Sequence, residues 1–325
     1  MSALQSELLE LRQKYEHLQH ERDSQQEHLG RMQAELFAVR NQIQRQSQFC
    51  ASLGAVMGNL IWKASRLPVV IDMFLSGNKV GDLLNIVNGS LISFLETYES
   101  CIPGQCTDES QFIMSVCGIV TNIAAAPAGR QFLISSSNGK ELLEQFCRVL
   151  AHIPLPSGNA LKRLLLMALY NTSINENGLR FLQQQQYLLS AITQDLQINT
   201  TSELKLMSLR LLQSLTYDIP NKSVLNGILK EVSLEMLQPM TQSSEAELKN
   251  VVGDIIDNIN KALKKYGKNA SQGDNQIRAK CPGSCDEALV YRAPCMQRTN
   301  IHNESPNACP SSGRCTKSIS YKRIA

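Results

Sequence analysis

Two asparagines and an arginine could bind a peptide, because each lies in or beside an apolar helical run. Asn122 falls near the end of the run from Phe112 to Ala125, and Asn171 falls near the end of a similar run that begins at Ala160. An asparagine side chain offers a donor and an acceptor, so it can pair with the N–H and C=O groups of a bound chain. Arg130 adds a guanidinium that can grip a carboxylate or a backbone carbonyl. These residues predict a peptide-binding groove.

A second interpretation of the asparagines is equally open at this point. Asparagine is common at helix C-termini, so Asn122 and Asn171 could instead cap the C-termini of their own helices. At the other end of the first run, Asp108 followed by Gln111 has the spacing of a capping box and predicts Asp108 as the N-cap.

The segment around Asn122 has a weaker copy downstream. Gly129 lies seven residues beyond Asn122, and Gly178 lies seven residues beyond Asn171. A third copy keeps the apolar helix and places Tyr217 near the asparagine position. Spacings of about 45 to 50 residues between buried helices are typical of armadillo or HEAT repeats. An irregular all-α domain with chance similarity is the alternative.

The N-terminal 62 residues carry a heptad pattern. With Leu4 at position d, the a and d positions stay apolar as far as Leu60 apart from Arg22, Gln25 and Gln46. A heptad pattern this long favours a coiled coil, and a solitary amphipathic helix packed on its own domain is the alternative. The residues predicted to pair two or more copies are Leu4, Leu8, Leu11, Leu18, Leu29, Met32, Leu36, Val39 and Ile43.

Two pairs of charged residues indicate a parallel orientation for the coil. Glu7 with Arg12, and Glu35 with Arg40, occupy g and following e positions, so they would be opposite in charge across a parallel homodimer. The indication is weak, because an exposed ion pair contributes only about 0.2 to 1 kcal/mol.

Composition changes after residue 266. Residues 267–325 are polar, aperiodic and rich in Pro, Ser and Asn, which predicts a disordered tail. A zinc site there, with His302 as a ligand, is disfavoured because the cysteine spacing lacks paired C-x₂₋₄-C motifs. His17 and His20 lie a helical turn apart, but a solvated coil face explains them. We therefore expect no metal and no cofactor. The tail cysteines are Cys281, Cys285, Cys295, Cys309 and Cys315.

The remaining chemistry of the chain argues against several function classes. A net charge of +3 with interspersed acids and bases gives no electrostatic footprint for nucleic acid. We find no signal peptide and no apolar run of the roughly 18 to 20 residues that a membrane span needs. No nucleophile elbow, P-loop, HExxH or Rossmann fingerprint appears, which favours a non-enzyme. Cys117 and Cys147 lie in apolar runs and are expected to be inert.

Three segments resemble a known family. They are DESQFIMSVCGIVTNIAAAPAGRQFLISSS, LLLMALYNTSINENGLRFL and QFCASLGAVMGNLIW, and they are similar to the heat shock factor 2-binding protein family over residues 1 to 265. The resemblance implies a non-enzymatic adaptor of meiotic homologous recombination. Its N-terminal coil oligomerises, and its armadillo domain binds a segment of the breast cancer type 2 susceptibility protein. That binding helps to bring strand-exchange recombinases to meiotic double-strand breaks. Asn122, Arg130 and Asn171 match the family's groove positions.

The overall prediction is an all-α protein in three parts: a coiled coil at 1–62, an armadillo-like repeat domain at 63–266 and a tail at 267–325. The resemblance also implies heat shock transcription factor 2 as a partner, and a location on meiotic chromosomes in the nucleus and in the cytoplasm. The family's N-terminus is longer, and its first helix binds a meiotic partner. This chain begins within the coil, so that interaction is not carried over. A generic coiled-coil and helical-repeat scaffold is the alternative function.

Overall fold

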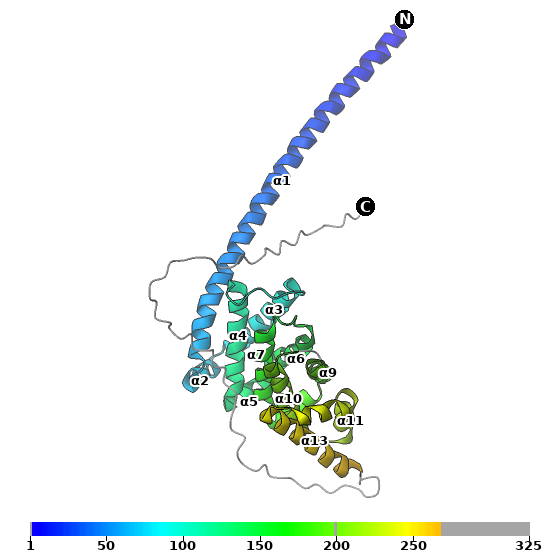
Figure 1. The fold of residues 1–325 in the computed structure, drawn as a ribbon. Helices are drawn as coiled ribbons and strands as arrows, with labels where there is room; N and C mark the ends of the chain where they lie inside the picture. The colour runs from blue at the N-terminus through cyan, green and yellow to red at the C-terminus, as the bar shows by residue number, and fades with distance from the viewer. Residues whose placement is uncertain (1, 198–199, 268–325) are drawn as a thin grey trace, which may run out of the picture. The chain divides into compact units, whose positions relative to one another are not determined.

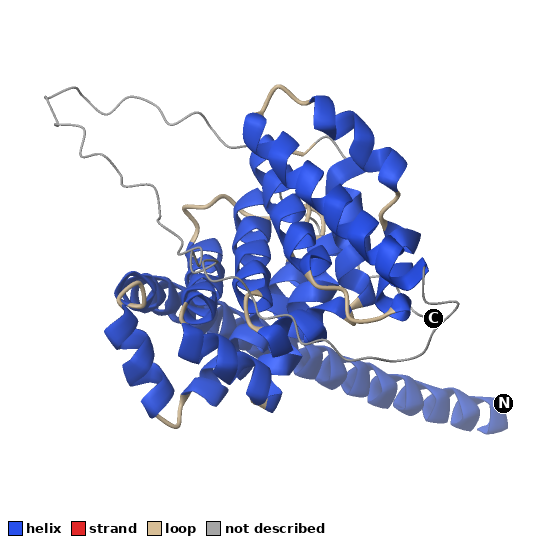
Figure 2. Cartoon of the chain, turned by 90° about the horizontal axis from the view of Figure 1, so that it is seen from below, coloured by secondary structure: helices blue, strands red, loops and turns tan. Residues whose placement is uncertain are grey.

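The computed structural model describes residues 2–197 and 200–267. Within them the chain forms α-helices and two short 3-10 helices, and no strand (Figures 1 and 2). The elements are α1 (Ser2–Ala64), α2 (Pro68–Ser76), α3 (Val80–Thr97), α4 (Asp108–Ala125), α5 (Pro127–Ser135), α6 (Ser137–Val149), η1 (Leu150–His152), α7 (Asn159–Ser173), α8 (Glu176–Gln183), α9 (Gln186–Gln197), α10 (Ser202–Tyr217), α11 (Lys222–Glu231), α12 (Leu234–Leu237), η2 (Gln238–Gln242) and α13 (Ala246–Gly267).

The helices after α1 form four successive units. The first three units are α2–α4, α5–α7 and α8–α10, and the fourth runs from α11 to α13. The last helix of each unit packs on the last helix of the next, so α4, α7, α10 and α13 form a stack, which Figure 1 shows for α4, α7 and α10. We call these the inner helices. The predicted all-α fold of stacked helical repeats is confirmed.

The C-terminal part of α1 serves as the first inner helix. Residues 51–64 of α1, and Ser65 directly after it, turn one face toward α4, where Ala55, Gly58, Trp62 and Ser65 are buried. Small side chains on α1 and α4 let the two helices approach closely. A Cβ added to Gly118 of α4 would lie 2.1 Å from the Trp62 indole. The predicted domain boundary between residues 62 and 63 therefore falls inside a continuous helix.

The N-terminal part of α1 is solvent-exposed. All but one of residues 3–50 are exposed, so the alternative of a helix packed along its own domain is wrong for this part of the chain. The nine residues predicted to form the coil seam are between 53% and 74% exposed. An isolated helix with an apolar seam leaves that surface in water, which is unfavourable.

Helix starts in the repeat domain follow ordinary capping chemistry. Thr107 is the N-cap of α4, where its side chain accepts a hydrogen bond from the Ser110 N–H. The prediction of Asp108 as the cap was wrong by one residue. Asp108 is instead the first helical residue, where its negative charge interacts favourably with the positive end of the helix dipole. The polar caps of α6, α8, α10 and α11 are Ser136, Asn175, Thr201 and Asn221.

Three further sequence predictions concern the C-terminal tail, membrane-spanning helices and metal sites. Apart from Gly267, which ends α13, the tail predicted for 267–325 lies outside the described residues, as do its five cysteines. Over the described part of the chain, no single helix is long and apolar enough to cross a membrane, although the bent pair α4 and α5 passes on length and composition alone. Within the same residues, no group of three or more His, Cys, Asp and Glu side chains could hold a metal ion.

Candidate functional site

Asn122 lies between α4 and the end of α1. Its Nδ2 donates to Ser65 Oγ at 2.9 Å and, more weakly, to the Trp62 carbonyl at 3.4 Å. Ser65 Oγ itself donates to the Trp62 carbonyl at 2.8 Å. The Asn122 side chain thereby satisfies polar groups at the C-terminal end of α1, where carbonyl groups have no partners within the helix.

Asn171 repeats this arrangement one unit later. Its Nδ2 donates to the Thr121 carbonyl of α4 at 3.3 Å. Asn122 and Asn171 each lie four residues before the N-cap of the next helix. The carbonyls that they bond, on Trp62 and Thr121, are also equivalent, each five residues before such a cap. We call this pair of contacts the asparagine ladder.

The next rung of the ladder has different chemistry. Tyr217 of α10 occupies the position equivalent to Asn171, four residues before the cap Asn221, and it is 58% exposed. Here Ser173 Oγ donates to the Tyr170 carbonyl at 2.6 Å and lies 2.7 Å from Ser214 Oγ. A serine pair thus links α7 to α10 where an asparagine links the earlier helices.

Arg130 and Arg180 also donate hydrogen bonds to backbone carbonyls at the C-terminal ends of inner helices. Arg130 of α5 donates from Nη1 to the Ala125 carbonyl at 3.0 Å, the last carbonyl of α4. Arg180 of α8 donates to the carbonyl of Asp218, the C-cap of α10, at 2.9 Å, and also pairs with the Asp218 carboxylate. Cationic side chains are favourable at helix C-termini.

These positions correct the expected location of the three predicted groove residues. Asn122 is 3% exposed, Asn171 is 0% exposed and Arg130 is 8% exposed. They lie between helices instead of lining an open surface. The capping alternative is closer in chemistry, but each asparagine donates to a carbonyl near the end of the preceding inner helix. Whether any of the three affects peptide binding stays a prediction.

A different set of side chains forms the accessible surface of the inner helices. The Arg163 guanidinium of α7 lies 2.6 Å from the Glu203 carboxylate of α10. Arg210 of α10 pairs with Glu247 of α13, and Gln213 Nε2 donates to Asp254 of α13 at 2.7 Å. The arginines are about a third exposed and their acidic partners more than half. We call this surface the inner-helix face: Arg163, Glu203, Arg210, Gln213, Tyr217, Glu247 and Asp254.

The inner-helix face can recognise an extended peptide. Its guanidiniums can bind carboxylates or backbone carbonyls, its carboxylates can bind cationic side chains, and Tyr217 offers an exposed ring. These ion pairs are partly exposed, so each contributes little to folding, and a ligand can replace one partner at small loss. The sequence signal for this face was an arginine inside a leucine-rich helix, at Arg163 and Arg210.

The interior holds groups that are unsuited to catalysis. Burial raises the pKa of the Cys117 thiol to about 12, and burial also raises the pKa of Cys147. Both thiols are therefore protonated at neutral pH, and a thiol must ionise to act as a nucleophile. Their predicted character as inert small hydrophobes agrees with this environment.

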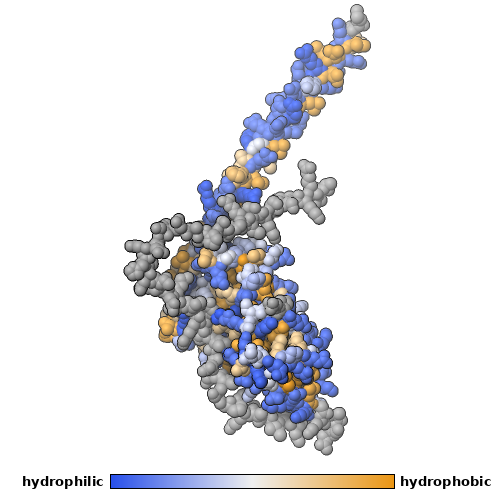
Figure 3. All heavy atoms as spheres, in the orientation of Figure 1, coloured by the Kyte–Doolittle hydropathy of each residue, from blue (hydrophilic) through white to orange (hydrophobic). Residues whose placement is uncertain are grey.

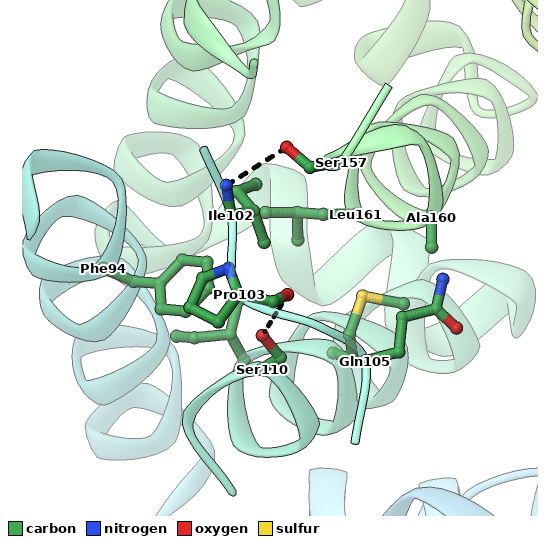
Figure 4. A pocket seen from close by; sticks show the side chains of 10 residues that line it. Phe94, Ile102, Pro103, Gln105, Ser110, Ser157, Ala160 and Leu161 are labelled. Carbon is green, nitrogen blue, oxygen red and sulfur yellow. Dashed lines mark hydrogen bonds between the residues drawn. The ribbon is translucent and has the colours of Figure 1, made fainter. Parts of the chain in front are cut away.

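The hollow between α3, α4 and α7 is too small for an organic ligand (Figure 4). It offers about 10 Å³, room for about one water molecule. Two hydrogen bonds close its rim: the Ile102 N–H donates to Ser157 Oγ, and Ser110 Oγ donates to the Pro103 carbonyl, both at 3.1 Å.

Comparison with known proteins places the chain in a family. The model of the heat shock factor 2-binding protein ARM-like domain matches residues 51–177 and 186–264, which is more than half of the chain. The chain belongs to this family. Its match begins at residue 51, where α1 starts to pack on α4, so the family's domain includes the first inner helix. An armadillo-like repeat family indicates a binding scaffold.

One curated relative and two solved structures show the degree of similarity. The heat shock factor 2-binding protein of Mus musculus is 29% identical over 264 residues, covering 78% of this chain and 77% of the relative. A crystal structure of an engineered protein has a TM-score of 0.48 at 13% identity, covering 66% of this chain and 78% of that one. A designed armadillo repeat protein has a TM-score of 0.38 at 10% identity, covering 66% and 94%. The family assignment rests on the domain match.

Proposed function

We propose that this protein is a non-enzymatic adaptor of meiotic homologous recombination that binds an extended segment of the breast cancer type 2 susceptibility protein. The inner-helix face is the observation that carries the proposal. It combines arginines that are about a third exposed, acidic side chains and an exposed tyrosine on α7, α10 and α13. The resemblance to the heat shock factor 2-binding protein family supplies the partner, and through it the task of bringing strand-exchange recombinases to meiotic double-strand breaks.

The asparagine ladder has a supporting role in this proposal. Asn122 links α4 to the end of α1, Asn171 links α7 to α4, and Arg130 caps α4, so these contacts fix the position of α7, the first helix of the inner-helix face. A preorganised surface binds more tightly because less conformational freedom is lost on association. Self-association through the seam from Leu4 to Ile43 would present two or more such faces and raise the avidity for a multivalent partner.

Heat shock factor 2 is the second candidate partner. The observation that favours it is the name of the curated relative, a heat shock factor 2-binding protein 29% identical to this chain. Both partners require a protein-binding surface and no catalytic group. The proposed location is the nucleus, on meiotic chromosomes, together with the cytoplasm, since the first partner acts on chromosomes.

Binding isotherms with single variants test the proposal. Purified full-length protein is titrated with overlapping fragments of the breast cancer type 2 susceptibility protein, and separately with heat shock factor 2. We expect Arg210→Ala to weaken binding to the first partner by about ten- to a hundred-fold, because it removes charge-assisted hydrogen bonds of roughly 1.5 to 3 kcal/mol. The melting temperature should barely change, since the Arg210–Glu247 pair is partly exposed.

A matched control is available on another helix. Arg148 of α6 pairs with Glu144 on the same helix and is about half exposed, away from the inner-helix face. Arg148→Ala should leave the affinity unchanged. If Arg210→Ala and Arg148→Ala bind the fragments equally well, the inner-helix face is not the binding surface. Binding of heat shock factor 2 alone would make it the partner of this chain.

A further inference from the structure

The linker between η2 and α13 carries two serines with different surroundings. The Ser243 Oγ accepts a hydrogen bond from the Glu245 N–H at 3.2 Å. The Lys249 N–H donates to the Glu245 carbonyl at 3.1 Å, which makes Glu245 the N-cap of α13. Ser244 lies between them, is exposed, and bonds no other described residue through its hydroxyl. It therefore presents a hydroxyl to solvent from a segment outside any helix.

Acidic side chains follow Ser244 at two defined positions. Glu245 lies one residue after it and Glu247 three residues after it, and both are exposed. Protein kinases select their substrates partly by the pattern of charges around the target residue. A kinase with basic pockets for the residues just after its target serine matches this pattern. The linker therefore has the sequence and the exposure of a kinase substrate.

Other residues with a glutamate three positions later are less suited to a kinase. Among the described residues, Ser24, Ser93 and Ser173 lie within α1, α3 and α7. Their helices would have to unwind before the serine could enter an active site as an extended chain. Thr200 is outside a helix, but it is half-buried and its hydroxyl donates to a backbone carbonyl at 3.0 Å. Ser244 alone in this set is exposed, non-helical and followed by two acids.

A phosphate on Ser244 would act on the inner-helix face. Ser244 lies three residues before Glu247, the partner of Arg210, so the Cα atoms of Ser244 and Glu247 are at most about 11 Å apart. Phosphoserine carries a charge of about −1.5 to −2 at neutral pH and three acceptor oxygens. The N-terminus of α13 favours this charge through the helix dipole. The phosphate then competes with Glu247 for Arg210 and repels the carboxylates of a bound peptide.

We propose that Ser244 is a phosphorylation site for a protein kinase that recognises acidic residues, and that phosphate there weakens peptide binding at the inner-helix face. The Ser244 Oγ bonds to the γ-phosphorus of ATP as the bond from that phosphorus to the β–γ bridging oxygen breaks. ADP leaves, and the hydroxyl proton passes to a base of the kinase. Figure 3 shows many hydrophilic residues over the part of the domain where Figure 1 places α10 and α13, so the added charge meets a polar surface. The effect on binding rests on the proposed function, and the modification itself does not.

Phosphorylation of the purified full-length chain tests the site. The protein is incubated with ATP and a kinase that prefers acidic substrates, and mass spectrometry of its peptides locates the phosphate. We expect phosphate on Ser244, and Glu247→Gln should slow its transfer by about ten-fold, as loss of one charge-assisted contact to the kinase would. Glu235→Gln, an exposed acid on α12, is the matched control and should leave the rate unchanged. An unmodified Ser244 after exhaustive treatment overturns the inference.

Binding isotherms test the effect of the phosphate. The treated and untreated chains are titrated with the fragments of the breast cancer type 2 susceptibility protein. Treatment should weaken binding by about ten-fold, the loss expected when one charge-assisted contact is removed. The Ser244→Ala chain, treated in the same way, should keep its affinity, which excludes an effect of phosphate elsewhere. Circular dichroism checks that each chain is folded.

The two failures are distinguishable. If phosphate is mapped to Ser244 and the affinity is unchanged, the regulatory part of the inference is overturned and the proposed function stands. If the untreated chain binds none of the fragments, the proposed function fails and the regulatory part falls with it. In that case the mapping of phosphate still decides whether Ser244 is a kinase substrate.

Discussion

Two joints of the inner-helix stack solve the same packing problem with different chemistry. The joint between α1 and α4 relies on shape. Gly58 faces Ser115, and Gly118 faces Trp62 so closely that neither glycine tolerates a larger side chain without a shift. Its polar contacts are incomplete, since Ser115 Oγ and Asn122 Oδ1 are buried without a hydrogen-bond partner.

The joint that links α7, α9 and α10 relies on a buried ion pair. The side chains of Lys162 and Asp195 are only 2% and 1% exposed, and they pair directly. The second carboxylate oxygen of Asp195 accepts a hydrogen bond from Ser208 Oγ at 2.8 Å. A buried pair of this kind contributes less to net stability than its Coulomb energy suggests, yet removing one member is strongly destabilising. The joint between α1 and α4 therefore depends on glycines that allow close packing, and the joint that links α7, α9 and α10 depends on a buried ion pair.

The largest expected loss of stability comes from breaking the ion pair that links α7 and α9. Asp195→Asn leaves the Lys162 ammonium buried without a counter-charge, which typically costs about 3 to 5 kcal/mol. Urea denaturation at neutral pH measures the free energy of unfolding directly. The double variant Lys162→Met with Asp195→Leu removes both charges and should recover most of the loss. If the double variant is as unstable as Asp195→Asn, packing and not charge governs this joint.

The sequence predicted the repeats better than it predicted the site. Apolar runs ending in an asparagine and followed by a glycine marked the inner helices, because each repeat buries the same face against its neighbours. A Cβ on Gly129 would lie 1.9 Å from the Ile123 carbonyl, and one on Gly178 would lie 2.2 Å from the Thr172 carbonyl. Gly129 and Gly178, which recur in the two similar segments, are thus required where one helix turns tightly into the next.

The site was harder to predict because exposure depends on tertiary neighbours. Asn122 is a residue type that suits a peptide-binding groove, but the end of α1 covers it. Nothing in the sequence near residue 122 indicates that residues 62 and 65 lie against it. The Lys162–Asp195 pair joins residues of separate helices, so no local pattern predicts it. Arg163 and Arg210 were visible in the sequence, but only the stack shows that they bridge successive inner helices.

A smaller effect tests whether the first joint depends on shape. Gly118→Ala places a methyl group against the Trp62 indole, and overpacking of this kind costs about 1 to 3 kcal/mol. Gly89→Ala in α3 is the matched control, because a Cβ there meets nothing within 4 Å. The control should gain up to about 1 kcal/mol from the better helix propensity of alanine. Thermal and urea unfolding of both variants measure the difference, and equal stabilities would show that α1 shifts freely on α4.

The smallest expected losses of stability come from removing either asparagine of the asparagine ladder, Asn122 or Asn171. Asn171→Ala removes the hydrogen bond to the Thr121 carbonyl from a fully buried site, which should cost about 1 to 2 kcal/mol. Asn122→Ala should cost less, about 0.5 to 1 kcal/mol. It also removes a buried Oδ1 that has no hydrogen-bond partner, and Ser65 keeps its own bond to the Trp62 carbonyl.

Urea unfolding of the two single variants and the double variant under identical conditions gives this order. The two effects should add, because Asn122 donates to Ser65 and the Trp62 carbonyl at one joint and Asn171 donates to the Thr121 carbonyl at the next. A larger loss for Asn122→Ala than for Asn171→Ala would contradict the comparison. It would mean that Asn122 Oδ1 gains a partner in solution, such as an ordered water, and that the joint between α1 and α4 depends on polar contacts as much as the later one does.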